Sequence, residues 1–112
     1  MKNSVILITN NGIGHADQPL QHMLVLKYLE LLLQHEELPN AICFYTEGVK
    51  LVTQGSPVLE QFSALEVRGV RLIVCSTCLN YFGLADQVKV GIVGGMADIL
   101  EAQMKADKVI TL

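Results

Sequence analysis

The sequence contains no tryptophan, and aromatic residues make up only 5% of its 112 residues. Proteins that bind single-stranded nucleic acid commonly stack the bases on aromatic side chains, so this scarcity disfavours such a function. Lysine and arginine are scattered singly rather than clustered, and the formal net charge is −3. A negative chain is a poor match for nucleic acid or for an anionic membrane surface. We therefore expect no nucleic-acid partner and no membrane partner.

Long hydrophobic runs are also absent. The first apolar run, residues 5–8, is shorter than the roughly 7–15 residues of a signal-peptide core. No stretch approaches the ~20 apolar residues of a membrane span. The number of cysteines is three, which is odd, and without a secretion signal this favours a reducing compartment in which thiols stay free. We expect a cytoplasmic protein.

Motifs for common cofactors are missing or incomplete. No GxxxxGK[ST] phosphate-binding motif occurs. The loop after the first apolar run contains Gly12 and Gly14, but Asp17 stands at the third glycine position of a dinucleotide fingerprint, where its carboxylate would repel a pyrophosphate. A structural zinc site usually has four ligands in two pairs, whereas this chain has one CxxC pair and a distant Cys43. We expect neither a metal nor an organic cofactor.

Strand-forming and helix-forming segments alternate along the chain. Apolar runs predict strands at residues 4–9, 41–45, 70–75 and 109–111, and a fourth strand or an extended segment at residues 88–93. Helical patterns predict helices at residues 18–36, 57–66, 78–82 and 96–105, and the short segment 49–53 is ambiguous. The first strand shows no alternation of polar and apolar residues, as in a parallel sheet covered on both faces. The sequence therefore predicts one α/β domain over residues 1–112, a three-layer sandwich with a mostly parallel sheet of about five strands.

The helix predicted at residues 18–36 has a wide apolar surface. Its polar residues Lys27, Glu30 and Gln34 fall on one stripe, and most of the remaining circumference is leucine, methionine and valine. One face of a sheet cannot cover so much apolar surface, and large exposed patches usually mark interfaces. We expect a homo-oligomer, either a dimer or a trimer.

The pair Cys75 and Cys78 is the strongest functional candidate, because it follows the apolar run 69–74 at the end of a predicted strand. In open α/β sheets, ligands bind beyond the carboxyl ends of the strands. A thiol near a helix N-terminus lies among unpaired N–H groups that favour the thiolate. The alternative is that both residues are ordinary core cysteines. Cys43, inside the second predicted strand, is expected to be an inert core thiol.

Two polar residues are further candidates at the same edge of the sheet. His15 lies in the loop after the first predicted strand, and its side chain titrates near neutral pH, so it could exchange a proton near the thiols. Its alternative role is that of a solvated loop residue. Glu47 follows the second predicted strand and could orient a base or a partner. We treat both as candidate substrate-binding residues.

Several segments taken together resemble one family. They are FYTEGV at residues 44–49, the thiol that ends the third predicted strand, and the C-terminal stretch from GMADIL (95–100) to DKVI (107–110). Their order and spacing are similar to those of the DsrE/TusD-like sulfur-relay proteins. The stretch CSTCLNYFGL (75–84) is most similar to the YedF-like, sulfurtransferase-like subgroup linked to selenium metabolism.

The resemblance implies a small α/β protein with a parallel sheet that assembles into oligomers. It implies a sulfur carrier or sulfurtransferase-like protein, which accepts a sulfane sulfur as a cysteine persulfide and passes it on. The implied partners are a sulfur-donor protein and a sulfur-acceptor protein. Such chemistry suits an enzyme and a stoichiometric carrier equally. The alternative function is a non-catalytic binding or assembly module that uses the same DsrE-like fold.

Two arguments differ on which thiol carries the sulfur. Alignment without gaps from Gly83 places the family's sulfur-bearing cysteine on Cys75. The helix dipole favours Cys78, which is nearer the free N–H groups. In CxxC sites on helices, however, the first cysteine is usually the exposed nucleophile. The sequence therefore favours Cys75 as nucleophile and Cys78 as the resolving thiol, which would release the sulfur by forming a disulfide.

Overall fold

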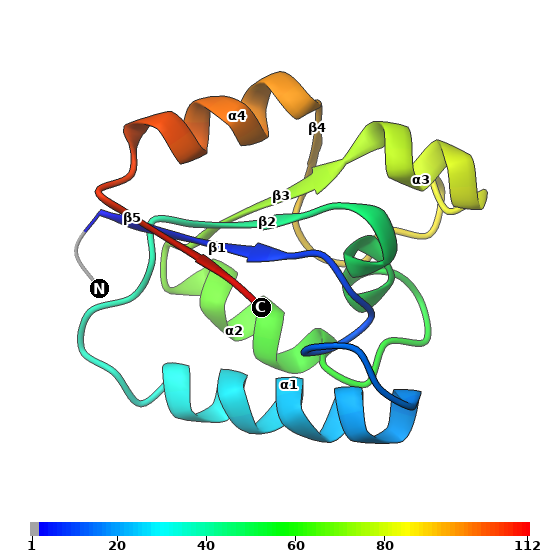
Figure 1. Ribbon diagram of the computed structural model, residues 1–112, viewed down its shortest axis with the longest axis horizontal. Helices are drawn as coiled ribbons and strands as arrows, with labels where there is room; N and C mark the ends of the chain where they lie inside the picture. Colours follow the sequence, from blue (N-terminus) through cyan, green and yellow to red (C-terminus); the bar gives the residue numbers. More distant parts are fainter. Residues whose placement is uncertain (1–2) are drawn as a thin grey trace.

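The apolar runs of the sequence form a parallel sheet (Figure 1). The computed structural model describes residues 3–112, and within them the sheet has five strands in the order β4-β3-β2-β1-β5. All neighbouring strands pair in parallel. The strands are β1 (Ser4–Ile8), β2 (Ala41–Phe44), β3 (Arg71–Cys75), β4 (Ile92–Gly94) and β5 (Lys108–Thr111). The predicted α/β class is confirmed, and the sheet is entirely rather than mostly parallel.

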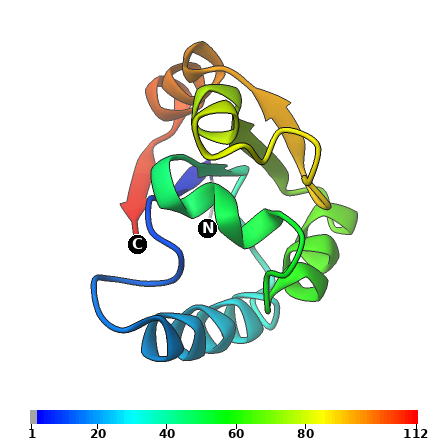
Figure 2. The ribbon, with the colours of Figure 1, turned by 90° about the vertical axis from the view of Figure 1, so that its right-hand side faces the viewer.

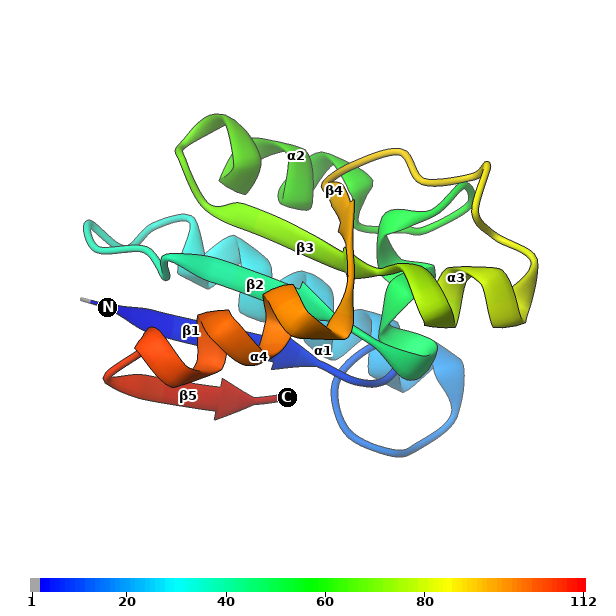
Figure 3. The ribbon, with the colours of Figure 1, turned by 90° about the horizontal axis from the view of Figure 1, so that it is seen from above.

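The central strands are covered on both faces. Every residue of β1 and of β2 is buried, which explains why their sequences are unbroken apolar runs. Helices α1 (Gln18–Leu32) and α2 (Leu59–Val67) cover one face, and α4 (Met96–Lys105) covers the other (Figures 1 and 3). This is the expected three-layer arrangement.

Two short helices lie at the edge of the sheet where the strands end. The 3-10 helix η1 (Thr46–Val52) follows β2, and α3 (Ser76–Phe82) follows β3. Figure 2 looks onto this edge and shows η1 and α3 side by side in front of the sheet. The segment 49–53, ambiguous in the sequence, thus belongs mostly to η1.

Helix α1, helix α2 and strand β4 are shorter than predicted, and α3 begins two residues earlier than predicted, at Ser76. Helix α1 ends at Leu32 rather than near residue 36, because His35 and Glu36 are exposed and add nothing to the buried face. Helix α2 begins at Leu59 rather than at residue 57, after a turn in which Val58 N–H donates to Ser56 Oγ. Strand β4 begins at Ile92 rather than at residue 88. Val88 instead forms an isolated bridge with Thr53, and Lys89 N–H donates to the carbonyl of Val52 at the end of η1.

Large apolar side chains remain exposed on both faces of the molecule. On α1 they are Leu20, Met23, Leu24 and Leu31. On the opposite side they are Ile92 and Val93 of β4 with Met96, Leu100 and Met104 of α4. The three α4 residues recur every fourth position and therefore form one stripe. No helix within residues 3–112 is long and apolar enough to cross a membrane.

Self-association stays a prediction, and the two exposed apolar faces make it testable. We expect light scattering at micromolar concentrations to give a mass that is a multiple of 12.3 kDa. Leu24→Glu on α1 and Leu100→Glu on α4 each place a charge at the centre of one face. The variant that reduces the mass identifies the face used, and the other variant serves as its control. A parent protein of 12.3 kDa at every concentration tested would contradict the prediction.

Candidate functional site

The two cysteines of the CxxC pair lie at the junction of β3 and α3. Cys75 is the last residue of β3 and caps α3, and its side chain is only 1% exposed. Cys78 lies in the first turn of α3 and is half-buried. The more accessible thiol is therefore the second of the pair, which is the reverse of the order that CxxC sites on helices usually show.

The Cys78 sulfur accepts a hydrogen bond from a distant segment of the chain. The Thr46 N–H, at the start of η1, donates to Cys78 Sγ with an N–S distance of 3.0 Å. Thr46 has a φ of 49°, in the left-handed region, which costs a non-glycine residue about 1–2 kcal/mol. Its hydroxyl lies 2.6 Å from the Thr9 carbonyl oxygen and 2.7 Å from that of Tyr45, so it can donate to either. The ends of β1, β2 and β3 thus meet around one sulfur.

Close packing of backbone on backbone fixes the position of η1. Tyr45 N–H donates to the Ile8 carbonyl, with an N–O distance of 3.2 Å. A Cβ on Gly48 would overlap that same carbonyl, so only glycine allows the chain to approach so closely. A glycine four residues after the end of β2 was the signal in the sequence for this contact. It pointed to a turn, but it could not identify Thr46 as the residue that reaches the thiol.

Opposing effects set the acidity of the Cys78 thiol. Burial is the largest of them and raises its pKa, and a hydrogen bond with the Cys75 side chain raises it further. The Thr46 N–H and the Cys78 N–H both lower the pKa, but the net shift is upward. Because α3 has only seven residues, the expected helix dipole is small, and the Thr46 N–H supplies the stabilisation expected from it.

Cys43 behaves as the sequence indicated, as a thiol of the core. It lies in β2 with no exposed surface. Burial raises the pKa of Cys43 to about 11, although the positive charge of Arg71 acts in the opposite direction. A thiol so protonated and so covered does not react with a partner protein.

His15 and Glu47 lie together in a separate polar pocket. The pocket has a volume of about 240 Å³ and is lined by Asn10, Asn11, His15, Ala16, Gln18, Gln21, Glu47 and Lys50. Glu47 forms an ion pair with Lys50, whose ammonium group lies 4.6 Å from the centre of the Phe82 ring on α3. Neither cysteine lines this pocket, and within residues 3–112 His15 makes no hydrogen bond to either thiol. The predicted residues therefore form two neighbouring groups, joined by the peptide bond between Thr46 and Glu47.

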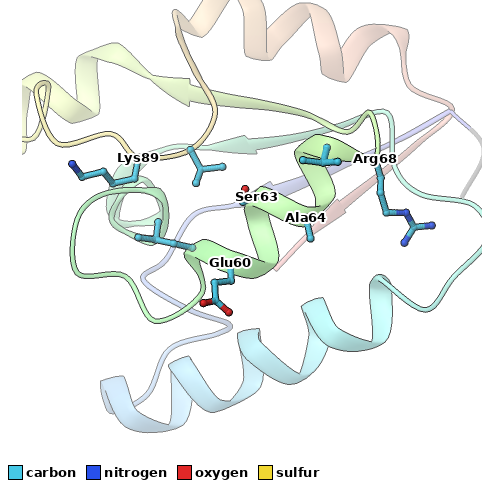
Figure 4. A pocket seen from close by; sticks show the side chains of 8 residues that line it. Glu60, Ser63, Ala64, Arg68 and Lys89 are labelled. Carbon is cyan, nitrogen blue, oxygen red and sulfur yellow. The ribbon is translucent and has the colours of Figure 1, made fainter.

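A larger depression lies away from the cysteines, along α2 (Figure 4). Its volume is about 680 Å³, and it is lined by Leu59, Glu60, Ser63, Ala64, Val67, Arg68, Lys89 and Val90. Figure 4 shows Glu60, Arg68 and Lys89 pointing in different directions. Arg68 donates to the carbonyl oxygens of Leu33 and His35, which explains its position structurally. This depression has no convergent set of reactive groups.

In the part of the chain that the structure describes, no three His, Cys, Asp or Glu side chains come close enough to bind a metal ion together.

The fold is shared with several solved structures. The chain superposes on the ychN protein of E. coli with a TM-score of 0.75 at 18% identity, covering 100% of both chains. It matches MTH1491 of Methanobacterium thermoautotrophicum, a protein of unknown function, with a TM-score of 0.69 at 23% identity, covering 97% of each chain. It matches BT1422 of Bacteroides thetaiotaomicron, also of unknown function, with a TM-score of 0.69 at 15% identity, covering 98% of this chain and 95% of that one. At these identities the likeness shows the fold alone.

The family follows from the sequence. The model of the DsrE/DsrF-like family matches residues 3–112. The chain therefore belongs to the DsrE/DsrF-like family, which is generally related to sulfur relay. No curated protein matches the sequence.

The burial of the three thiols predicts the order in which they react. With iodoacetamide under native conditions, we expect Cys78 to be alkylated first, and Cys43 and Cys75 to react only after denaturation. Since the Cys78 pKa is raised, its rate should keep increasing above pH 9.0, the ordinary thiol value. Peptide mapping by mass spectrometry measures each site. Native alkylation of Cys75 as fast as that of Cys78 would contradict the burial order.

Proposed function

We propose that the protein is a sulfur carrier, which accepts a sulfane sulfur on Cys78 as a cysteine persulfide and passes it to an acceptor protein. The observation that carries this proposal is the accessible Cys78 sulfur, which receives the Thr46 N–H at 3.0 Å and has a second thiol beside it. Membership of a family related to sulfur relay supports the same chemistry. The CxxC sequence also supports the narrower, YedF-like assignment within that family.

The choice of Cys78 over Cys75 rests on access. A donor or acceptor protein has to bring its own sulfur into contact with the carrier thiol. Cys75 is 1% exposed, whereas Cys78 is half-buried. We therefore assign the first acceptance to Cys78, and the favoured role of Cys75 as nucleophile becomes that of a resolving thiol.

Acceptance and delivery are two exchanges of the same kind. The Cys78 thiolate attacks the terminal sulfur of a donor persulfide, R–S–SH. A bond forms between Cys78 Sγ and that sulfur, the donor S–S bond breaks, and the donor leaves as a thiolate. For delivery, an acceptor thiolate attacks the same terminal sulfur and Cys78 leaves as a thiolate. One S–S bond replaces another in each step, so no external oxidant or reductant is required.

Cys75 provides a second route for the sulfur. Its side chain is close enough to the Cys78 thiol to raise the pKa of that thiol, so the two sulfurs are neighbours. A Cys75 thiolate that attacks Sγ of the Cys78 persulfide forms the Cys75–Cys78 disulfide, and HS⁻ leaves with the electron pair of the broken S–S bond. Two equivalents of an external thiol restore the dithiol. Persulfide that finds no acceptor is then released as sulfide.

The polar pocket beside the thiols is proposed to contact the partner. His15 and Glu47 line it at the edge of the sheet that carries Cys78, so a protein that approaches the thiol also covers this pocket. The Glu47–Lys50 pair offers both signs of charge to the partner. The donor and the acceptor are proposed to be proteins, in line with the net charge of −3, which disfavours nucleic acid and anionic membranes.

Loading with a small thiol persulfide tests the carrier function. We expect the parent protein to gain the mass of one sulfur atom on Cys78. Cys78→Ser should load at least about tenfold less sulfur than the parent, because the accessible thiolate is the nucleophile. Cys75→Ser should load as much sulfur as the parent. Cys43→Ser is the matched control and should load like the parent.

Other patterns of loading have distinct meanings. Retention by Cys78→Ser with loss by Cys75→Ser would return the carrier role to Cys75. An unmodified parent protein after exhaustive treatment would favour the alternative, a non-catalytic binding or assembly module.

Sulfide release tests the role of Cys75. After loading and removal of excess persulfide, the parent should release HS⁻ and form an intramolecular disulfide, whereas Cys75→Ser should keep its persulfide much longer. Sulfide is measured colorimetrically and the disulfide by the loss of two hydrogen atoms in the intact mass. Equal release from both proteins would show that Cys75 is not the resolving thiol.

A further inference from the structure

We infer that Thr46 is a positioning residue for the Cys78 sulfur: its hydroxyl holds a left-handed turn that keeps the Thr46 N–H directed at Cys78 Sγ. This inference deepens the proposed function: the effect of Thr46 on sulfur transfer rests on Cys78 being the sulfur carrier. The geometry itself, and the test below, need only a thiol that titrates.

The backbone conformation of Thr46 is not one that threonine prefers. Within residues 3–112, only Asn3 and Thr46 have a positive φ without being glycine, and asparagine tolerates that region far better than a β-branched residue does. A strained conformation persists only where its surroundings enforce it, and such residues gather at functional sites. Thr46 lies at such a site, because its own N–H contacts the Cys78 sulfur.

The hydroxyl of Thr46 supplies the enforcing contact. It lies 2.6 Å from the carbonyl oxygen of Thr9, which follows β1, and 2.7 Å from that of Tyr45. The single hydroxyl proton is therefore offered to two carbonyl groups on adjacent strand ends. Without the hydroxyl, only the packing of Gly48 against Ile8 still supports the left-handed turn, and residue 46 can relax toward negative φ. That relaxation turns its N–H away from Cys78.

No other charged group on the neighbouring elements takes over this task. The charged or titratable groups on the two elements packed against α3 are Arg71 and Cys75 on β3, and Glu47 and Lys50 on η1. Arg71 is at the opposite end of β3, and Glu47 and Lys50 pair with each other. Cys75 raises the Cys78 pKa, whereas the Thr46 N–H lowers it. The peptide N–H is the group from η1 that favours the thiolate.

The same N–H assists both halves of the proposed transfer. It favours the Cys78 thiolate that attacks the donor persulfide. It also stabilises the Cys78 thiolate that leaves when the acceptor attacks, and a better leaving thiolate departs faster. Loss of the contact should therefore slow loading and delivery alike.

The test is the pH profile of Cys78 alkylation by iodoacetamide, followed by peptide mapping. Thr46→Val removes the hydroxyl at nearly constant shape and should raise the Cys78 pKa by about one unit, which lowers the neutral-pH rate about tenfold. Thr46→Ser keeps the hydroxyl, and Thr46→Gly adopts positive φ without strain, so both should titrate like the parent. Thr53→Val is the matched control, because the Thr53 hydroxyl donates to the Lys50 carbonyl at the other end of η1.

A Cys78 pKa that is the same in Thr46→Val as in the parent overturns the inference. An equal shift in Thr53→Val also overturns it, since the effect would then be a general loosening of η1. If Thr46→Val does not fold, Thr46→Ala removes the same hydroxyl without the β-branch and is judged by the same criteria. Persulfide loading is scored separately: a shifted pKa in a protein that never loads supports the positioning role of Thr46 and rejects the carrier function.

Discussion

The register of three parallel strands is the constraint on which the site depends. Ile8 of β1 pairs with Phe44 of β2, and Phe44 pairs with Val74 of β3, so these three strands end in one row. The next residue of each chain segment is Thr9, Tyr45 or Cys75, the last of which still belongs to β3. The Thr46 N–H and the Cys78 sulfur that meet at the site come from the turns just beyond. A slip of one residue in β2 would move its side chains to the opposite faces and carry Thr46 away from the thiol. Because β1 and β2 are buried on both faces, such a slip would misplace closely packed core side chains, and the core thereby fixes the geometry of the edge.

Two opposing effects act on the ionisation of the Cys78 thiol. Desolvation favours the neutral thiol, and the peptide N–H groups favour the thiolate. A fully exposed thiol is more susceptible to oxidation, and a fully buried one, such as Cys43, cannot meet a partner. Half-burial raises the pKa of Cys78 and so favours the protonated thiol in the free protein. The Thr46 N–H from η1 is already in place to stabilise the thiolate when it forms. The left-handed conformation of Thr46 costs of the order of 1–2 kcal/mol. Gly48 packs directly against the end of β1 and thereby helps to hold the turn at Thr46 in this conformation.

The sequence predicted the fold in more detail than it predicted the site. Unbroken apolar runs with helices between them are sufficient for a parallel α/β sheet, and all five strands and the main helices were located from them. The strand at residues 88–93 was placed too early, since Val88 pairs with Thr53 rather than with the sheet. This pairing is a tertiary contact, which the periodicity of the sequence does not reveal. Cys75, Cys78, His15 and Glu47 could be proposed as candidates because strand ends and reactive residue types are visible in a linear sequence. Thr46 was missed because its contribution is a backbone N–H, set by a φ that no threonine prefers, and it reaches a residue 32 positions away.

The fold tolerates extensive sequence change, whereas the site depends on individual residues. The solved structures of similar fold illustrate the tolerance of the fold. Chains with 15–23% identity keep TM-scores of 0.69–0.75, because a parallel core requires apolar residues of suitable size rather than particular ones. Chemistry at the carboxyl edge depends instead on a few individual groups, so that a shared fold by itself does not define an activity. In this chain those groups are two sulfurs, one peptide N–H and the hydroxyl that directs it. Changing the hydroxyl would leave every strand pairing intact and still alter the acidity of the thiol, which is why activity in such a fold can vary while the architecture remains constant.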